Sequence, residues 1–319
     1  MNATEVLITA AQIIGGFLLL FFGGDWLVDG GVSLARRFRI SPLVIGMTIV
    51  AFGTSAPELL VSLISAIKGS SGIALGNVVG SNIANIGLIL GLTAIIYPIE
   101  TDNRKVIVNG TVMIMASLLL ILFSLHSGIS RIEGIILFLC LILFTTVSVK
   151  KGRMRKQDMD TDQEPDGKIK TLPAALGLII LSCCMLAFGA DILVDGATTL
   201  ASAMGVSDKV IGLTIVALGT SLPELAASVA AAFKKQMDIS IGNVIGSNIF
   251  NILCVLGVST TIKPISLEFQ DYISDFIWMM GFSVFILIFT TMRKKKGRLG
   301  RTAGILFLLA YAVYAWSLF

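Results

Sequence analysis

The amino-acid sequence predicts an all-α polytopic membrane protein with ten transmembrane helices, arranged as two inverted five-helix repeats with broken helices at the bilayer midplane. Three observations lead to this prediction: the composition, a series of apolar segments and a gapless internal repeat. Of 319 residues, 55% are hydrophobic and 14% are charged, whereas soluble domains average about 25% charged residues. The formal charge of +4 indicates no nucleic-acid partner, because the basic residues lie in loops between apolar runs.

Ten segments are apolar and long enough, or nearly so, to cross a hydrocarbon core of about 30 Å. In chain order they cover residues 6–24, 42–67, 72–98, 106–125, 131–149, 172–190, 209–233, 238–262, 275–292 and 302–318. The only long polar stretch, residues 150–170, follows the fifth segment, and we interpret it as a solvated linker. The chain is thereby divided into a first repeat at 1–149, a linker at 150–171 and a second repeat at 172–319.

The basic residues predict how the segments are oriented in the membrane. Loops after odd-numbered segments contain 20 of the 24 lysines and arginines, and the opposite side contains Lys68, Arg131, Lys209 and Lys263. Short loops rich in lysine and arginine stay in the cytoplasm. We therefore expect a multi-pass protein of the cell membrane, with both termini outside and the linker in the cytoplasm.

The internal repeat is the strongest signal in the sequence. Residues 23–99 align with 189–265 at a constant offset of 166, with 40 identities in 77 positions. Equivalent helices are five segments apart, an odd number, so the two copies must have opposite orientations in the membrane. Inverted repeats of this kind are typical of secondary transporters, which bind their ions near the midplane between the halves.

A Gly-Thr-Ser-x-Pro-Glu motif lies inside the second apolar segment at 53–58 and recurs at 219–224 in the seventh. A carboxylate in hydrocarbon costs on the order of 3 kcal/mol or more, and therefore indicates a functional site. Pro57 has no N–H and its ring crowds the carbonyl four residues earlier. We expect the helix to break just before Glu58 and to leave carbonyls unpaired, which a bilayer tolerates only inside the protein or beside a water-filled cavity.

The residue types in this motif suit a hard cation. Thr54 and Ser55 lie four and three residues before Glu58, on the same helical face. Two hydroxyls, a carboxylate and freed carbonyls form an all-oxygen set, which favours calcium, magnesium or sodium.

A second polar stretch, Gly-Asn-Val-x-Gly-Ser-Asn-Ile-x-Asn, occurs at 76–85 and again at 242–251. The serine and the last asparagine of each copy are four residues apart and share a helical face. We predict that this face binds the cation; its members are Ser81, Asn85, Ser247 and Asn251. We interpret the remaining amides as bridges between helices; these are Asn77, Asn82, Asn243 and Asn248.

Two aspartates four residues apart also recur, near the predicted ends of the first and sixth segments. They are Asp25 and Asp29 in the first copy, and Asp191 and Asp195 in the second. We expect interfacial caps or solvated turns at these positions. The alternative is an acidic entrance that concentrates cations.

Together these motifs resemble the alpha-repeats of the sodium/calcium exchanger family, prokaryotic type, within the cation/calcium antiporter superfamily. The resemblance covers essentially the whole chain. It implies four ion sites in a central diamond, and alternating access in which the first and sixth helices slide over a fixed core. The implied metal ligands are Thr54, Ser55, Glu58, Ser81 and Asn85 with the carbonyl of Ala51, and Thr220, Ser221, Glu224, Ser247 and Asn251 with the carbonyl of Ala217.

The predicted function is antiport of sodium against calcium. One calcium ion neutralises two glutamates, and sodium ions use the same oxygens in its absence. Potassium-dependent relatives have an aspartate where this chain has Asn251, so the resemblance implies potassium-independent exchange, which we expect to be electrogenic. We expect no cofactor, and the partners are calcium and sodium ions and the lipid bilayer, with no obligate protein partner evident.

Three alternatives stay open. A calcium/proton antiporter could use the buried glutamates as proton carriers, although such relatives have more acids in the second motif. A cation channel could use the same carboxylates. An intramembrane enzyme is least favoured and we predict none, because Ser55 and Ser221 have no adjacent histidine or lysine base, and His126 lies in a turn-like stretch.

Overall fold

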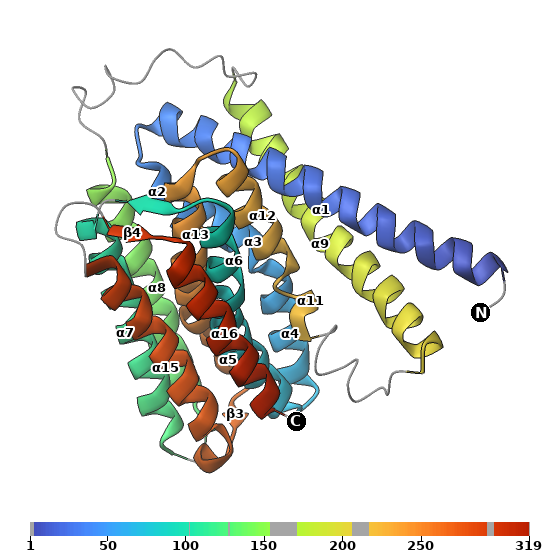
Figure 1. Ribbon diagram of the computed structural model, residues 1–319. Helices are drawn as coiled ribbons and strands as arrows, with labels where there is room; N and C mark the ends of the chain where they lie inside the picture. The colour runs from blue at the N-terminus through green and yellow to red at the C-terminus, as the bar shows by residue number, and fades with distance from the viewer. Residues whose placement is uncertain are drawn as a thin grey trace.

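The computed structural model describes residues 3–101, 103–126, 128–153, 171–205, 217–291 and 297–318. Figure 1 shows a bundle of steeply inclined helices with one pair of helices, α1 and α9, along its side. Seven described helices are long and apolar enough to cross a membrane, or eight if one bent pair counts as a single span. The all-helical, multi-span prediction is therefore confirmed, and the count of ten helices stays a prediction.

The helices follow most of the predicted segments within a few residues. The first half contains α1 (Ala3–Phe38), α2 (Pro42–Ile45), η1 (Gly46–Val50), α3 (Ala51–Thr54), α4 (Ala56–Ile67), α5 (Ser71–Ala84), η2 (Asn85–Leu90), α6 (Gly91–Ile96), α7 (Asn103–Ser124) and α8 (Arg131–Lys151). The second half contains α9 (Leu172–Ala203), α11 (Ala217–Gly219), α12 (Leu222–Phe233), α13 (Met237–Phe250), η5 (Asn251–Leu256), α14 (Gly257–Ile262), α15 (Phe269–Thr291) and α16 (Arg301–Ser317). The elements named η are π-helical. The start of the seventh predicted segment and most of the linker lie outside the described residues.

Two helices are much longer than predicted. α1 continues to Phe38 and α9 to Ala203, whereas the apolar runs suggested ends near residues 24 and 190. The recurring aspartates therefore lie inside helices, and the prediction of caps or solvated turns for them is wrong; they are Asp25, Asp29, Asp191 and Asp195. An apolar run ends where the helix first carries a charge, and this need not be where its backbone hydrogen bonds stop.

Four short strands connect the two halves reciprocally. β1 (Ile99–Thr101) pairs antiparallel with β4 (Gly297–Leu299), and β2 (Gly128–Ile129) pairs antiparallel with β3 (Ile265–Ser266). β1 and β3 occupy equivalent positions in the repeat alignment, and each pairs with a strand of the other half. This exchange is what two copies related by a two-fold axis would produce.

α1 and α9 pack closely against each other through glycines. A Cβ at Gly16 would lie 2.7 Å from Leu193 Cβ, and a Cβ at Gly189 would lie 2.8 Å from Leu19 Cβ. One buried apolar cluster connects this pair to η1 and α12, and a larger cluster fills the rest of the bundle. The pair therefore lies on the side of the bundle (Figure 1) and packs there against η1 and α12.

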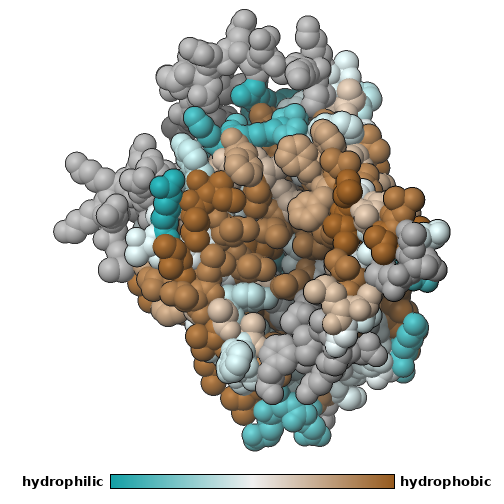
Figure 2. All heavy atoms as spheres, turned by 45° about the vertical axis from the view of Figure 1, so that its right-hand side comes forward, coloured by the Kyte–Doolittle hydropathy of each residue, from teal (hydrophilic) through white to brown (hydrophobic). Residues whose placement is uncertain are grey.

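The outer surface carries a wide apolar belt. Figure 2 shows hydrophobic residues across the middle of one face and hydrophilic residues gathered toward its two ends. Large apolar side chains such as Leu7, Ile132 and Ile277 are each well over half exposed. A soluble surface rarely exposes so much contiguous apolar area, so this belt fits a lipid bilayer.

Candidate cation-binding site

Both proline-containing motifs interrupt their helices as predicted. In the first copy α3 ends at Thr54, Ser55 has φ −83° and ψ 7°, and α4 begins at Ala56. The helical segments on either side of this break differ in direction by 47°. In the second copy Ser221 has φ −88° and ψ 1°, and α12 begins at Leu222. The two serines have nearly the same backbone conformation, because the two motifs share the same local sequence.

The breaks bring glutamates from opposite halves of the chain into one buried cluster. Glu58 and Glu224 are both fully buried. Ser55 Oγ of the first copy donates a hydrogen bond to Glu224 Oε1 of the second at 2.9 Å. Ser247 Oγ donates to the same oxygen at 3.5 Å. The fold therefore brings the two motif copies together, as the repeat predicted.

Several oxygens of this cluster are buried without a hydrogen-bond partner among the described residues. They are both carboxylate oxygens of Glu58, Oε2 of Glu224, Oγ of Ser221, Oδ1 of Asn85 and Oδ1 of Asn251. Roughly nine in ten buried polar groups in proteins do have a partner. A cation coordinated by these oxygens would supply what they lack, and hard oxygen donors suit calcium or sodium.

Asn77 and Asn243 connect each break to the neighbouring helix. Asn77 Nδ2 donates to the carbonyl oxygen of Glu58 at 3.3 Å and to Ser62 Oγ at 2.9 Å. Asn243 makes the two equivalent bonds in the second copy, at 3.3 Å and 3.0 Å. The prediction of helix-bridging amides is confirmed here. The serines they contact were missed, although Ser62 and Ser228 are identical at the repeat offset.

Thr54 and Thr220 form hydrogen bonds between the two copies. Thr54 Oγ1 lies 3.2 Å from Asn243 Oδ1, and Thr220 Oγ1 lies 3.3 Å from Asn77 Oδ1. An amide oxygen accepts only, so each hydroxyl is the donor in these contacts, and Thr54 Oγ1 also has the carbonyl oxygen of Ala51 as an acceptor at 3.3 Å. Both threonine oxygens keep lone pairs with which they could coordinate a cation.

The two predicted carbonyl ligands differ from each other. The carbonyl oxygen of Ala51 accepts the N–H of Ser55 at 2.9 Å, so it is hydrogen-bonded and not free. Proline removes only the bond that its own N–H would have made, and the N–H of Ser55 is unaffected. In the second copy the N–H of Ser221 donates to Leu218 O at 3.1 Å, instead of to Ala217 O.

The asparagines of α5 and α13 divide into bridging and free amides. Asn85 Nδ2 donates to Asn248 Oδ1 at 3.1 Å, and Asn82 Nδ2 donates to Asn248 O at 3.4 Å, so both bonds join α5 or η2 to α13. Asn251, by contrast, has neither amide atom hydrogen-bonded within the described residues. Ser81 is buried beside these amides on α5. The π-helices η2 and η5 begin at Asn85 and Asn251, and π-helical turns are frequent at functional sites.

Two carboxylates supply the negative charge of the cluster. Across the part of the chain that the structure describes, no three His, Cys, Asp or Glu side chains come together. Asp25 and Asp29 instead form ion pairs with Lys234. Sequence reasoning missed this pairing, although Lys68 and Lys234 occupy equivalent positions in the two copies.

Comparisons with known proteins agree with this geometry. A family model described as sodium/calcium exchanger protein matches residues 8–150 and 174–319. The sodium/calcium exchanger MaX1 of Methanosarcina acetivorans is 31% identical over 95% of this chain and 96% of its own. The inner membrane protein YrbG of Escherichia coli is 34% identical over 98% of each chain.

A solved structure also matches over the whole length. The sodium-calcium exchanger NCX_Mj, soaked with 10 mM Na+ and zero Ca2+, is 36% identical, and it superposes with a TM-score of 0.84 over 98% of this chain and 100% of that chain. The family model covers both repeats, and the two relatives extend over nearly all of the chain. This membrane protein therefore belongs to the sodium/calcium exchanger family.

Proposed function

We propose that this protein is a secondary antiporter that exchanges sodium for calcium by alternating access, without potassium and with net movement of charge. The observation that carries the proposal is the buried pair Glu58 and Glu224, in which three of the four carboxylate oxygens have no hydrogen-bond partner among the described residues. Buried anions persist in a bilayer when a cation or a proton compensates them. Membership of the family supports sodium and calcium as the transported cations.

The cations are held by oxygens from both halves of the chain. The proposed ligands are the side chains of Thr54, Ser55, Glu58, Ser81, Asn85, Thr220, Ser221, Glu224, Ser247 and Asn251, with the carbonyls of Ala51 and Ala217. Each of these side chains is buried or half-buried in the structure. The carbonyl oxygen of Ala51 already accepts the N–H of Ser55 at 2.9 Å and the hydroxyl of Thr54 at 3.3 Å, so a cation there would replace the longer contact with Thr54.

Charge explains why sodium and calcium exclude each other. The two glutamates give the site a charge of about −2 when ionised, which one calcium ion neutralises. Sodium ions use the same oxygens, so they replace calcium instead of accompanying it. The empty, doubly anionic site is costly to move through a low-dielectric barrier, whereas the loaded site is not. This difference couples the two fluxes.

The charge of about −2 on the two glutamates also supports electrogenic exchange. More than two sodium ions per calcium would carry excess positive charge across the membrane, so transport would respond to voltage. Asn251 is a neutral amide and adds no third negative charge to the site. The site therefore has no additional anion with which to retain potassium.

We further propose ten membrane segments, a first repeat at 1–149, a linker at 150–171, a second repeat at 172–319, and both termini outside the cell membrane. Position 126 tests this orientation, because His126 is exposed in the turn between α7 and α8. A cysteine there should react with impermeant thiol reagents from the outside only. Labelling from the cytoplasm alone would reverse the orientation.

Calcium uptake by proteoliposomes containing the purified chain tests the function. Vesicles loaded with sodium and diluted into sodium-free buffer should take up calcium, with or without potassium, and an imposed inside-positive potential should change the rate. Uptake driven by a proton gradient and not by sodium would establish calcium/proton antiport instead. Uptake that needs no counter-ion gradient, accompanied by single-channel currents, would indicate a channel.

A further inference from the structure

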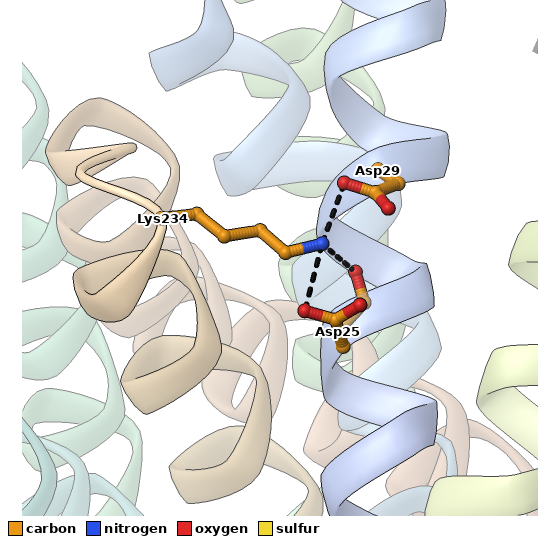
Figure 3. A network of polar contacts seen from close by, with 3 residues as sticks. All are labelled: Asp25, Asp29 and Lys234. Carbon is orange, nitrogen blue, oxygen red and sulfur yellow. Dashed lines mark hydrogen bonds and ion pairs between the residues drawn. The ribbon is translucent and has the colours of Figure 1, made fainter. Parts of the chain in front are cut away.

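An ion-pair cluster fastens α1 to the end of α12. Lys234 Nζ lies 2.8 Å from Asp25 Oδ1 and 2.5 Å from Asp29 Oδ1, and it also donates to the backbone carbonyl of Asp25 at 2.7 Å. Figure 3 shows the lysine extending from the end of α12 to α1, where it lies between the two aspartates. We call these three residues the Lys234 cluster.

The Lys234 cluster holds α1 over the helix that carries Glu224. A Cβ at Gly24 would lie 2.7 Å from the carbonyl oxygen of Ala226, so α1 and α12 are in close contact beside the cluster. Ala227, on the same helix, is 1% exposed and belongs to the apolar cluster that includes α1. α1 therefore covers the face of α12 that contains Ala226 and Ala227.

The first lysine and the second pair of aspartates are equivalent to the Lys234 cluster in the repeat alignment, but they form no such cluster among the described residues. At the repeat offset, Lys68 corresponds to Lys234, and Asp191 and Asp195 correspond to the two aspartates. We call these three residues the Lys68 counterpart. Its members are all exposed, and within the described residues no ion pair joins them.

The helix beside the Lys234 cluster is also more covered than the helix beside the Lys68 counterpart. On α4, Leu60 is 59% exposed and Val61 is 36% exposed. Their equivalents on α12 are Ala226, which Gly24 contacts, and Ala227, which is buried. α1 thus covers α12, while α9 leaves the corresponding face of α4 uncovered.

α1 and α9 pack closely against each other along their length. Each helix has glycines where the other helix approaches most closely. These positions include Gly16 and Gly189, and also Gly30, where a Cβ would lie 2.6 Å from Ile179 Cγ1. A shift of one helix without the other would open these contacts. Movement of the pair over the core would instead exchange the covered face for the uncovered one.

We propose that the Lys234 cluster and the Lys68 counterpart are reciprocal latches of the transport cycle. When α1 and α9 shift as a unit, the Lys234 cluster separates and the Lys68 counterpart closes on the opposite membrane face. The inference rests on the proposed alternating access, and it adds the six residues that determine which face is closed. In the inverted repeat, the second arrangement is the first one with the two copies exchanged.

The exposure of the cluster suits a contact that must break in every cycle. The side chains of Lys234, Asp25 and Asp29 are 25%, 38% and 47% exposed, so water screens their attraction. Exposed ion pairs of this kind each contribute little free energy, and the loss of one changes an equilibrium constant by roughly fivefold. Removing one latch should therefore shift the balance of the two arrangements several-fold without unfolding the protein.

Cross-linking measures the two arrangements directly. In a background with the native cysteines replaced, one protein carries Asp29→Cys with Lys234→Cys and another carries Asp195→Cys with Lys68→Cys. A short bifunctional thiol reagent should join both pairs in membranes, and each cross-link should stop sodium-driven calcium uptake until it is cleaved by reduction. If the second pair never cross-links while the first does, the reciprocal latch is overturned.

Single substitutions then test reciprocity. Lys234→Met should raise cross-linking of the 68/195 pair several-fold, and Lys68→Met should raise cross-linking of the 29/234 pair. Lys235→Met is the matched control, because Lys235 is exposed beside the cluster, makes no described ion pair, and should change neither yield. Equal yields in all three variants would overturn the proposal. Cross-linking requires no sodium/calcium exchange, so its outcome is separate from that of the uptake assay.

Discussion

The two copies of the repeat have the same site residues in different surroundings. Ser55 donates to Glu224, while its equivalent Ser221 has no partner, and Glu58 accepts no side-chain hydrogen bond among the described residues. Within the two Gly-Thr-Ser-x-Pro-Glu motifs only the fourth position differs, with Ala56 in the first copy and Leu222 in the second. The difference accompanies the unequal positions of the two long helices, since α1 covers α12 and α9 leaves the equivalent face of α4 exposed. Under the proposed alternating access, these unequal surroundings would be exchanged between the two copies in the other arrangement.

Substitution of the two buried glutamates should cause the largest loss of calcium exchange. Glu58→Gln and Glu224→Gln should each lower calcium exchange by about 100-fold or more, because an amide cannot replace half of the charge in a buried site. The measurement is sodium-driven calcium uptake by variants that elute as the wild-type protein does. Glu268→Gln, at an exposed position, is the control and should retain full activity. Wild-type rates in either buried variant would remove that glutamate from the site.

Substitution of Ser55 and of Ser221 tests whether the two copies differ in calcium binding. Ser55→Ala removes both a proposed ligand and the hydrogen bond to Glu224, whereas Ser221→Ala removes a proposed ligand whose hydroxyl has no hydrogen-bond partner among the described residues. A hydrogen bond to a charged group contributes about 1.5–3 kcal/mol, so Ser55→Ala should weaken calcium binding by roughly tenfold or more, and Ser221→Ala by less. Calorimetry without sodium checks this difference. Equal losses would show that both copies are sampled equally at rest.

Much of this fold follows from the sequence, and the exceptions have physical causes. Pro57 predicts that the helix breaks before Glu58, and the constant offset identifies the equivalent break in the second copy. The lengths of α1 and α9 could not be read from apolar runs, because charged residues continue both helices. The partners of Lys234 were equally hidden, since the ion pairs join residues more than 200 positions apart. The hydrogen-bonded carbonyl of Ala51 depends on where the break begins, which proline alone does not determine.

Asn77 and Asn243 each accept a hydrogen bond from a threonine of the other copy, so their substitution tests how strongly the two copies depend on each other. Asn77→Leu breaks the contacts to Ser62 and to the Glu58 carbonyl, and it also leaves Thr220 without its acceptor. We expect a several-fold rise in the calcium KM, of the size of one or two neutral hydrogen bonds. Thr220→Val in the Asn77→Leu background should then have little additional effect, because their contributions are shared. Additive losses would show that the threonine acts independently of the amide. The matched pair is Asn243→Leu with Thr54→Val.

The smallest expected effect separates Asn251 from its equivalent. Asn251 has both amide atoms free among the described residues, so Asn251→Asp should add a third charge without losing a bond. Calcium retention should tighten on the order of fivefold, and exchange should become more sensitive to acid and to potassium. Asn85→Asp adds the same charge but loses the donor to Asn248 Oδ1 and places two acceptors together. Its gain should be smaller or absent. Calcium affinity and uptake measured with and without potassium distinguish the two variants. Wild-type exchange that requires potassium would show that Asn251 does not determine potassium independence.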